Sequence, residues 1–139
     1  ANRPVIKGKR IVLIDDSIVR GTTSHKIVRM MFEAGAREVH MRIASPPIRH
    51  PDFYGIDTPE ERALLAATHS LDEMRTYIGV DSLAFLSIDG VYRSVGLEGR
   101  DPARPQFTDH CFTGDYPTAL TDQGEPHLPR QLSLLAEAG

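Results

Sequence analysis

The feature that most constrains the fold is an apolar run that ends in two adjacent acidic residues and a loop of small hydroxyl side chains. Residues 10–24 read R-I-V-L-I-D-D-S-I-V-R-G-T-T-S. The apolar residues 11–14 are bounded by charge, which favours a strand buried on both faces of a parallel sheet, although four residues alone do not exclude a helical segment. Two neighbouring carboxylates repel each other unless a cation or hydrogen-bond donors bind them. The junction therefore predicts a ligand.

The next segments predict a strand–helix–strand unit. A helix is expected over residues 24–35, ended by Gly35, because apolar residues recur there at helical spacing. The predicted stripe consists of Ile27, Met30, Met31 and Ala34, widened by Val28 and Phe32. Alternating apolar residues at 39, 41 and 43 then predict a second strand, which Pro46 and Pro47 stop. We expect a right-handed crossover between the two strands.

Further elements are predicted downstream. Residues 58–61 (T-P-E-E) fit a capping box with Pro59 at the first helical position, and residues 70–73 (S-L-D-E) fit a second box whose helix ends at Gly79. A short strand is expected at 83–86 and a brief helix after it, closed by Gly96. Residues 129–139 fit either a short helix or a frayed tail. We expect residues 1–139 to form a single domain.

Size and charge limit the partners. The chain has 139 residues, 40% of them hydrophobic, which suits one ordinary globular domain, and its net charge of −3 argues against a nucleic-acid or anionic-membrane partner held by bulk charge. Cys111 is the only cysteine, so no internal disulfide can form. Because the sequence also lacks a membrane-length apolar run and a signal-peptide pattern, we expect a cytoplasmic protein that contacts no membrane.

The acidic pair and the loop suit a phosphorylated sugar. In a parallel sheet, ligands bind outside the carboxyl ends of the strands, where Asp15 and Asp16 are expected. The following helix N-terminus favours an anion, and Gly21 lets the backbone approach it. Arg20 adds positive charge, and the loop hydroxyls belong to Thr22, Thr23 and Ser24. A phosphate would bind in this loop, and a metal ion such as Mg²⁺ or a diol would bind the aspartates.

Other interpretations were weighed against this one. The acidic pair alone fits solvated turn residues, and the hydroxyl loop alone fits a plain helix cap. A Walker-type nucleotide loop is disfavoured because no G-K-[ST] is present, and a receiver domain would not need this loop. Cys111 beside Asp109 and His110 could be a nucleophile with a base, but a buried thiol is the better interpretation. The six histidines show no metal-ligand spacing.

With these residues identified, the stretch resembles the phosphoribosylpyrophosphate (PRPP) signature of type I phosphoribosyltransferases. Longer runs are similar to the glutamine PRPP amidotransferase family, namely N-R-P, D-D-S-I-V-R-G-T-T-S, A-G-A, S-P-P-I…H-P-D-F-Y-G-I-D-T-P and C-F-T-G-D-Y-P-T. They cover residues 2 to about 118. The resemblance implies an α/β chain with part of a type I phosphoribosyltransferase fold, in which a parallel sheet with flanking helices precedes a helical and loop-rich C-terminal region.

The resemblance also implies an activity. In this family of pentosyltransferases, ammonia from glutamine displaces pyrophosphate from PRPP and gives 5-phosphoribosylamine, the first step of de novo purine (IMP) biosynthesis. By resemblance, Asp15 and Asp16 would hold the ribose hydroxyls and Mg²⁺. Residues from Arg20 or Gly21 to Ser24 would bind the 5′-phosphate. The implied ligands are PRPP and, as feedback ligands, purine nucleotides, and we expect a homo-oligomer.

The chain departs from the family in two ways. Ala1 is not the family's nucleophilic cysteine, and neither the glutaminase domain nor the first strands and pyrophosphate loop of the transferase domain are recognised. We therefore expect a C-terminal piece without a glutaminase catalytic residue and without glutamine-dependent activity alone. Some members also carry an iron–sulfur cluster on four cysteines. Asp52 and Thr108 stand at two of those positions and only Cys111 matches, so no cluster is expected.

Two alternatives stay open from the sequence. The chain could act as a PRPP- or nucleotide-binding regulatory module without turnover, or it could belong to another type I phosphoribosyltransferase. The unrecognised strands also predict an unpaired edge at residues 11–14. An exposed apolar edge favours self-association or poor solubility.

Overall fold

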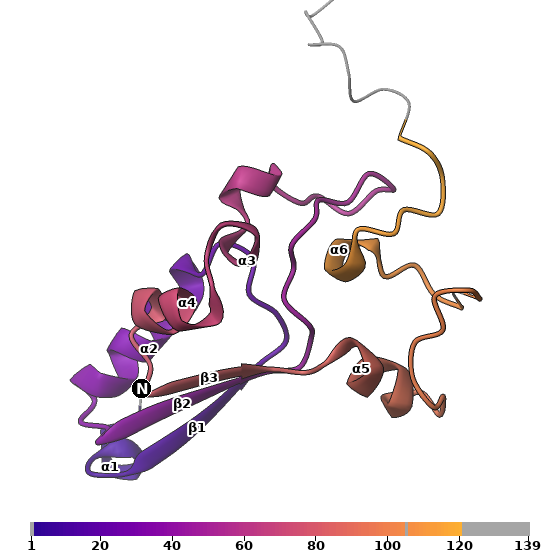
Figure 1. The fold of residues 1–139 in the computed structure, drawn as a ribbon. Coiled ribbons are helices and arrows are strands. Elements are labelled where there is room, and N and C mark those ends of the chain that lie inside the picture. The colour runs from indigo at the N-terminus through magenta and orange to yellow at the C-terminus, as the bar shows by residue number, and fades with distance from the viewer. Residues whose placement is uncertain (1, 105, 121–139) are drawn as a thin grey trace, which may run out of the picture.

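A three-stranded parallel sheet forms the centre of the structure (Figure 1). The structure is a computed structural model and describes residues 2–104 and 106–120. The strands are β1 (Arg10–Asp15), β2 (Glu38–Ile43) and β3 (Ser82–Phe85), in the order β1-β2-β3. In β1 and β2, Arg10 pairs with Glu38 and Asp15 with Ile43. The predicted α/β class, the parallel pairing and the three strands are confirmed.

The helices are mostly short, and α2 is the longest of those described. Their bounds are α1 Arg3–Ile6, α2 Thr22–Glu33, the 3₁₀ helix η1 Glu61–Ala63, α3 Leu65–Thr68, α4 Leu71–Ile78, α5 Ile88–Ser94 and α6 His110–Thr113. Figure 1 shows α2 and α4 side by side over one face of the sheet, whereas α5 and α6 lie beyond the carboxyl ends of the strands. Within the described ranges, none of these helices is long and apolar enough to cross a membrane.

The core lies between the sheet and the helices α2 and α4. The side chains of Val39, Met41 and Ile43 on β2 are at most 3% exposed, as their alternation with polar residues predicts. They belong to one apolar cluster that also contains Val28 of α2 and Met74 of α4. Burial of such side chains contributes about 1.5–3 kcal/mol each.

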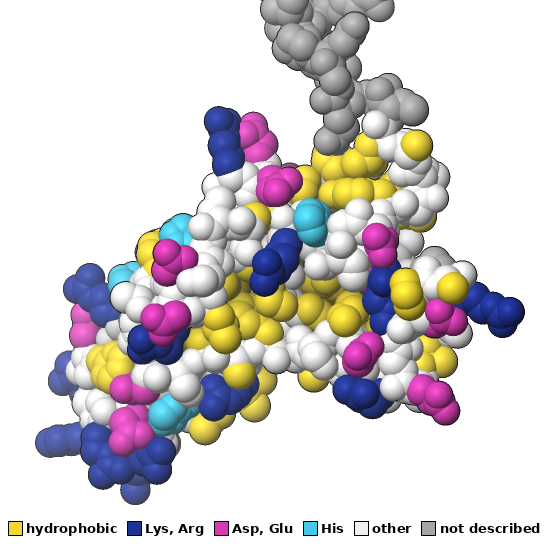
Figure 2. All heavy atoms as spheres, in the orientation of Figure 1, with side chains coloured by type: hydrophobic (Ala, Val, Ile, Leu, Met, Phe, Trp, Pro, Cys, Tyr) yellow, Lys and Arg dark blue, Asp and Glu magenta, His cyan; other side chains and the backbone are white. Residues whose placement is uncertain are grey.

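The opposite face of the sheet is open, and here the prediction of a strand buried on both faces is wrong. Val12 is 63% exposed and Ile14 is 74% exposed, and the residues that alternate with them in β1 are only partly buried. The reason is that no described helix covers this face; in addition, β1 lies at the edge of the sheet. Figure 2 shows hydrophobic side chains gathered across the middle of the molecule, near the ends of the strands that Figure 1 draws. The predicted exposed edge is therefore present.

The buried stripe of α2 differs from the predicted one. Met30 and Phe32 are 47% and 38% exposed, whereas Ser24, Val28 and Ala34 are buried. The apolar stripe of α2 is wider than the part of the helix that the sheet can cover. Helical spacing alone therefore does not identify which apolar residues of the stripe are buried. The predicted end of the helix is confirmed, because Gly35 has a φ of +94° and the N–H of the following residue donates to the carbonyl of Met31.

One predicted capping box is wrong and the other is confirmed. Residues 58–60 are not helical, and the hydroxyl of Thr58 instead accepts the backbone N–H of Asp52 at 2.6 Å. This use of the hydroxyl explains why Thr58 does not cap a helix. Ser70 and Glu73 form the predicted box at the start of α4, with Ser70 N–H donating to Glu73 Oε2 at 2.7 Å.

The remaining predictions concern the ends of elements. Gly79 and Gly96 have positive φ values of 83° and 89° after α4 and α5, as predicted. Before β1, the chain forms the single helical turn of α1, whose Ile6 is buried. The predicted helix or tail at residues 129–139 lies outside the described residues.

Candidate phosphate-binding site

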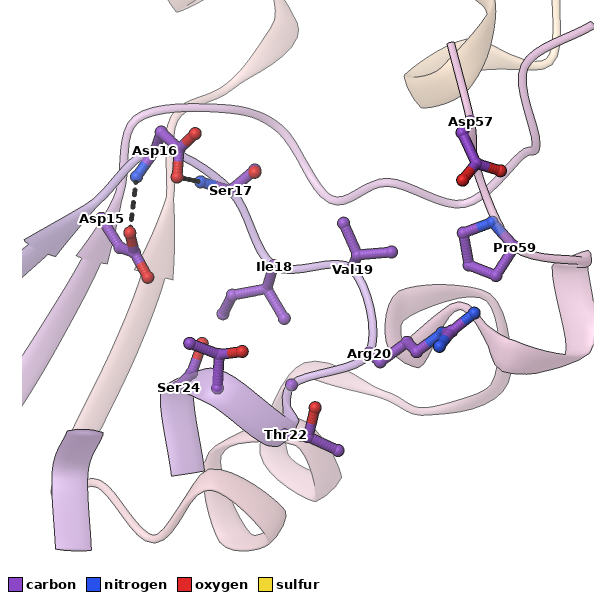
Figure 3. A pocket seen from close by; sticks show the side chains of 12 residues that line it. Asp15, Asp16, Ser17, Ile18, Val19, Arg20, Thr22, Ser24, Asp57 and Pro59 are labelled. Carbon is purple, nitrogen blue, oxygen red and sulfur yellow. Dashed lines mark hydrogen bonds between the residues drawn. The ribbon is translucent and has the colours of Figure 1, made fainter. Parts of the chain in front are cut away.

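A cavity of about 500 Å³ opens where β1 ends and α2 begins (Figure 3). It lies at the carboxyl end of the strands, where ligands bind in parallel sheets. Its lining residues are Asp15, Asp16, Ser17, Ile18, Val19, Arg20, Gly21, Thr22, Thr23, Ser24, Asp57 and Pro59. The structure thus brings every predicted phosphate-site residue into one cavity and adds two residues from a distant loop.

The two aspartates at the end of β1 are held by local hydrogen bonds. The N–H of Asp16 donates to Asp15 Oδ1 at 3.1 Å, and the N–H of Ser17 donates to Asp16 Oδ1 at 2.9 Å. The other oxygen of each carboxylate has no hydrogen-bond partner within the described part of the chain. These oxygens are available to a cation or to a ligand hydroxyl, which are the partners that paired carboxylates require.

The loop between β1 and α2 is packed tightly from behind. Ile18 is 1% exposed, and the carbonyl of Val19 accepts the N–H of Leu65 at 2.8 Å. Gly21 has a φ of +75°, and a Cβ placed there would lie 2.6 Å from Leu65 Cδ2 and 3.0 Å from Tyr77 Cε1. Glycine is therefore required at position 21 both by backbone conformation and by space.

The first turn of α2 faces the cavity. Gly21 is the N-cap residue, so the N–H groups of the following turn are not used by an earlier turn of the helix. Thr22 and Thr23 are exposed, whereas Ser24 is only 3% exposed although it lines the cavity. Since α2 has 12 residues, its N-terminus carries the positive end of a substantial helix dipole. This arrangement suits an anion.

Asp57 and Pro59 line the cavity, although they were not among the predicted site residues. Figure 3 shows both on the side of Arg20, across the cavity from Asp15 and Asp16. They follow the predicted helix α2 by more than twenty residues, so periodicity and local motifs carried no signal for their position. Their one sequence signal was their place in the run F-Y-G-I-D-T-P.

The loop that carries Asp57 is fixed by a buried carboxylate. Asp52, 9% exposed, accepts the N–H groups of Tyr54 and Ile56 at Oδ2, at 2.9 and 2.7 Å. Its Oδ1 lies 2.6 Å from Nε2 of His110. The hydrogen bond from Ile56 is the largest influence on the pKa of Asp52 and lowers it, against the effect of burial, and His110 lowers it further. The carboxylate is thus an acceptor, and His110 donates.

The positions compared with cluster cysteines are brought together only in part. One ligand atom each from Asp52, His110 and Cys111 lies within 4.8 Å of the others, whereas Thr108 is exposed. Both oxygens of Asp52 already accept hydrogen bonds. Burial, followed by the charge of Asp52, raises the pKa of the Cys111 thiol, which disfavours a thiolate nucleophile.

A second buried carboxylate organises the segment around α5 and α6. Asp109 is 6% exposed and accepts Nε of Arg100 at 2.6 Å and the hydroxyl of Tyr92 at 2.7 Å. Burial acts to raise the pKa of Asp109, but the hydrogen bonds from Arg100, Tyr92 and Thr113 outweigh it and lower the pKa. Arg100 also pairs with Asp115. Asp109 therefore does not serve Cys111 as a catalytic acid or base.

No protein-family model matches the chain. It is 64% identical over 140 residues to the amidophosphoribosyltransferase of Rhizobium etli, with 100% of the chain and 28% of that protein aligned. It is 52% identical over 129 residues to the Bacillus subtilis amidophosphoribosyltransferase, with 92% of the chain and 27% of that protein aligned. The chain thus spans little more than a quarter of the length of these relatives.

A solved structure shares the fold. It is the glutamine PRPP amidotransferase from Bacillus subtilis complexed with ADP and GMP, with a TM-score of 0.78 and 52% sequence identity. The match covers 88% of this chain and 27% of that chain.

Proposed function

The chain belongs to the amidophosphoribosyltransferase family, and on that premise we propose that it binds the ribose 5-phosphate part of PRPP. Within the whole enzyme, the bound PRPP would accept ammonia derived from glutamine and give 5-phosphoribosylamine, glutamate and pyrophosphate, the first step of de novo purine biosynthesis. The observation that carries the proposal is that the acidic pair and the phosphate loop line one cavity.

The proposed roles follow from the cavity. Asp15 and Asp16 accept hydrogen bonds from the ribose hydroxyls and ligate Mg²⁺ with their free oxygens, since hard cations prefer carboxylate oxygens. The 5′-phosphate binds residues 20–24, where the N–H groups of the first turn of α2, the hydroxyls of Thr22, Thr23 and Ser24, and the charge of Arg20 are available.

The chemistry would rest on orientation and on charge. Mg²⁺, when bound, would neutralise the pyrophosphate leaving group. The residues of this chain hold the ribose ring at a fixed place relative to the incoming ammonia, and they exclude alternative orientations of the phosphate. Among the residues that line the cavity, we assign none as a general acid or base.

The proposal extends to regulation and assembly. The Bacillus subtilis relative was solved with ADP and GMP, and we propose that purine nucleotides are also feedback ligands of the protein to which this chain belongs. We further propose a single domain over residues 1–139, a homo-oligomer in the cytoplasm, and no iron–sulfur cluster, because Cys111 is the only cysteine.

The acidic pair provides the direct test. We expect the double substitution Asp15→Asn/Asp16→Asn to weaken PRPP binding in the presence of Mg²⁺ by at least about tenfold, because one charge-assisted hydrogen bond alone is worth about 1.5–3 kcal/mol. Isothermal titration calorimetry of the 139-residue chain measures the affinity. Asp72→Asn, an exposed acidic residue of α4 outside the cavity lining, serves as the control. Equal affinity in the double variant and the wild type would remove the assignment.

A further inference from the structure

The cavity carries more negative than positive charge. Three carboxylates, those of Asp15, Asp16 and Asp57, line it together with a single guanidinium, that of Arg20. The proposed roles use the first two carboxylates and leave Asp57 without one. Figure 3 shows Asp57 on the same side of the cavity as Arg20, and therefore away from the two aspartates at the end of β1.

Asp57 is exposed, but the loop that carries it is tightly held. The buried carboxylate of Asp52 accepts two N–H groups of this loop, and the N–H of Asp52 donates to the hydroxyl of Thr58 at 2.6 Å. Thr58 follows Asp57 directly, so the backbone is fixed on both sides of Asp57. These hydrogen bonds keep the backbone of Asp57 at the cavity wall.

The loop is in turn attached to the segment around α6. His110 donates Nε2–H to Asp52 Oδ1 at 2.6 Å. The hydroxyl of Tyr116 donates to the carbonyl of Pro51 at 2.8 Å. The carbonyl of Cys111 accepts the N–H groups of residues 49 and 50. Asp52 and His110, which we name the anchor pair, are both buried and connect this segment to the cavity wall.

We propose that Asp57 is a specificity-determining residue of the phosphate site and that the anchor pair holds Asp57 in position. The carboxylate of Asp57 disfavours ligands that arrive without a divalent cation. The inference rests on the proposed function. A ligand phosphate in the loop lies close to a fixed carboxylate of the same sign. The repulsion is reduced when the ligand carries Mg²⁺, because the cation lowers the net charge of the complex.

The first experiment measures the ratio of PRPP affinities with Mg²⁺ and with a chelator. The backbone amide shifts of residues 21–24 are followed by NMR during titration, so that weak binding is also quantified. We expect Asp57→Asn to strengthen the binding of metal-free PRPP by about two- to fivefold, the range of exposed charge pairs, and so to lower the ratio. Glu98→Gln removes one exposed negative charge outside the cavity lining and should leave the ratio unchanged.

The second experiment tests the anchor pair. His110→Leu removes the donor to Asp52, and we expect the ratio to fall toward that of Asp57→Asn. His110→Gln retains an N–H donor and should keep a ratio near that of the wild type. In the double variant Asp57→Asn/His110→Leu, the ratio should fall no further than in Asp57→Asn, because both changes act on the same carboxylate.

The outcomes separate the inference from the proposed function. If wild-type protein binds no PRPP in either condition, the proposed function fails and the inference fails with it. If wild-type protein binds PRPP but Asp57→Asn leaves the ratio unchanged or weakens metal-free binding, only the inference about Asp57 is overturned. If His110→Leu lowers the melting temperature while the ratio stays at the wild-type value, the anchor pair is structural and its positioning role is rejected.

Discussion

At the scale of single residues, Gly21 shows how the chain shapes a binding loop. Its positive φ turns the backbone into the first turn of α2, and the absence of a Cβ lets the loop lie against Leu65 and Tyr77. The two constraints are separate, since one is set by backbone sterics and the other by neighbouring side chains. The same glycine therefore serves both the stability of the loop and the position of its N–H groups.

We predict that Gly21→Ala destabilises the protein by about 2–5 kcal/mol, from left-handed backbone strain of about 1–2 kcal/mol and overpacking of about 1–3 kcal/mol. Gly79→Ala is the matched control, because Gly79 has a similar φ of +83° but no atom within 4 Å of the place that an alanine Cβ would take. It should cost only the backbone strain of about 1–2 kcal/mol. Urea unfolding measures both values, and equal costs for the two variants would contradict the predicted overpacking.

At the scale of elements, β1 is paired along its backbone with β2 but carries exposed apolar side chains on one face. Its backbone pairs with β2 over the whole length of the strand, from Arg10 to Asp15. Its outward side chains Val12 and Ile14 remain largely exposed on the open face of the sheet. An apolar strand at a sheet edge is a template for association with another chain. The chain spans little more than a quarter of the length of its relatives.

We predict that the 139-residue chain self-associates through this face and that Val12→Lys/Ile14→Lys reduces the association. A charged side chain at an exposed edge position opposes pairing and costs little stability, since both positions are already in water. Sedimentation velocity over a range of concentrations measures the change. Val95→Lys, at a position 59% exposed beyond α5, is the control and should not alter association. A monomeric wild-type chain at all concentrations would contradict the prediction.

At the scale of the whole molecule, two kinds of packing stabilise the fold. The sheet with α2 and α4 surrounds an apolar cluster that runs from Ile18 to Leu83. The segment around α5 and α6 contributes Tyr92 as its buried aromatic residue, and there the carboxylate of Asp109 binds Arg100, Tyr92 and Thr113. Apolar packing is insensitive to pH, whereas a buried ion pair requires an ionised carboxylate.

This difference predicts how acid acts on the protein. Because the pKa of Asp109 is lower in the folded state than its ordinary value of 3.8, its contribution is fully present above that value and is lost as the pH falls through the lower folded pKa. We expect Asp109→Asn to lower the free energy of unfolding by about 3 kcal/mol at neutral pH, and by progressively less below pH 3.8. Urea unfolding over a pH series measures this difference. A constant difference down to strongly acidic pH would contradict the assignment.

Local patterns predicted the elements well, because strands, caps and glycine stops depend on neighbouring residues. The box of Ser70 and Glu73, the stop at Gly35 and the strand around Met41 are all as predicted. The errors arose where the tertiary surroundings of a side chain, and not its local spacing, decided its role. Thr58 fits a helix cap by its local sequence, but the backbone of Asp52 uses its hydroxyl. Met30 fits the core by its spacing, but the sheet covers a different strip of α2.

Local sequence patterns were enough to predict the three strands, the helices α2, α4 and α5, and the residues of the phosphate loop, which lie within fifteen consecutive positions. Contacts between distant segments became visible only in the folded chain, in which Asp57 lines the cavity and His110 binds Asp52 across 58 positions of sequence. The physical reason is that hydrogen bonding along a helix or turn is local, whereas burial and charge proximity depend on which distant segments fold against each other.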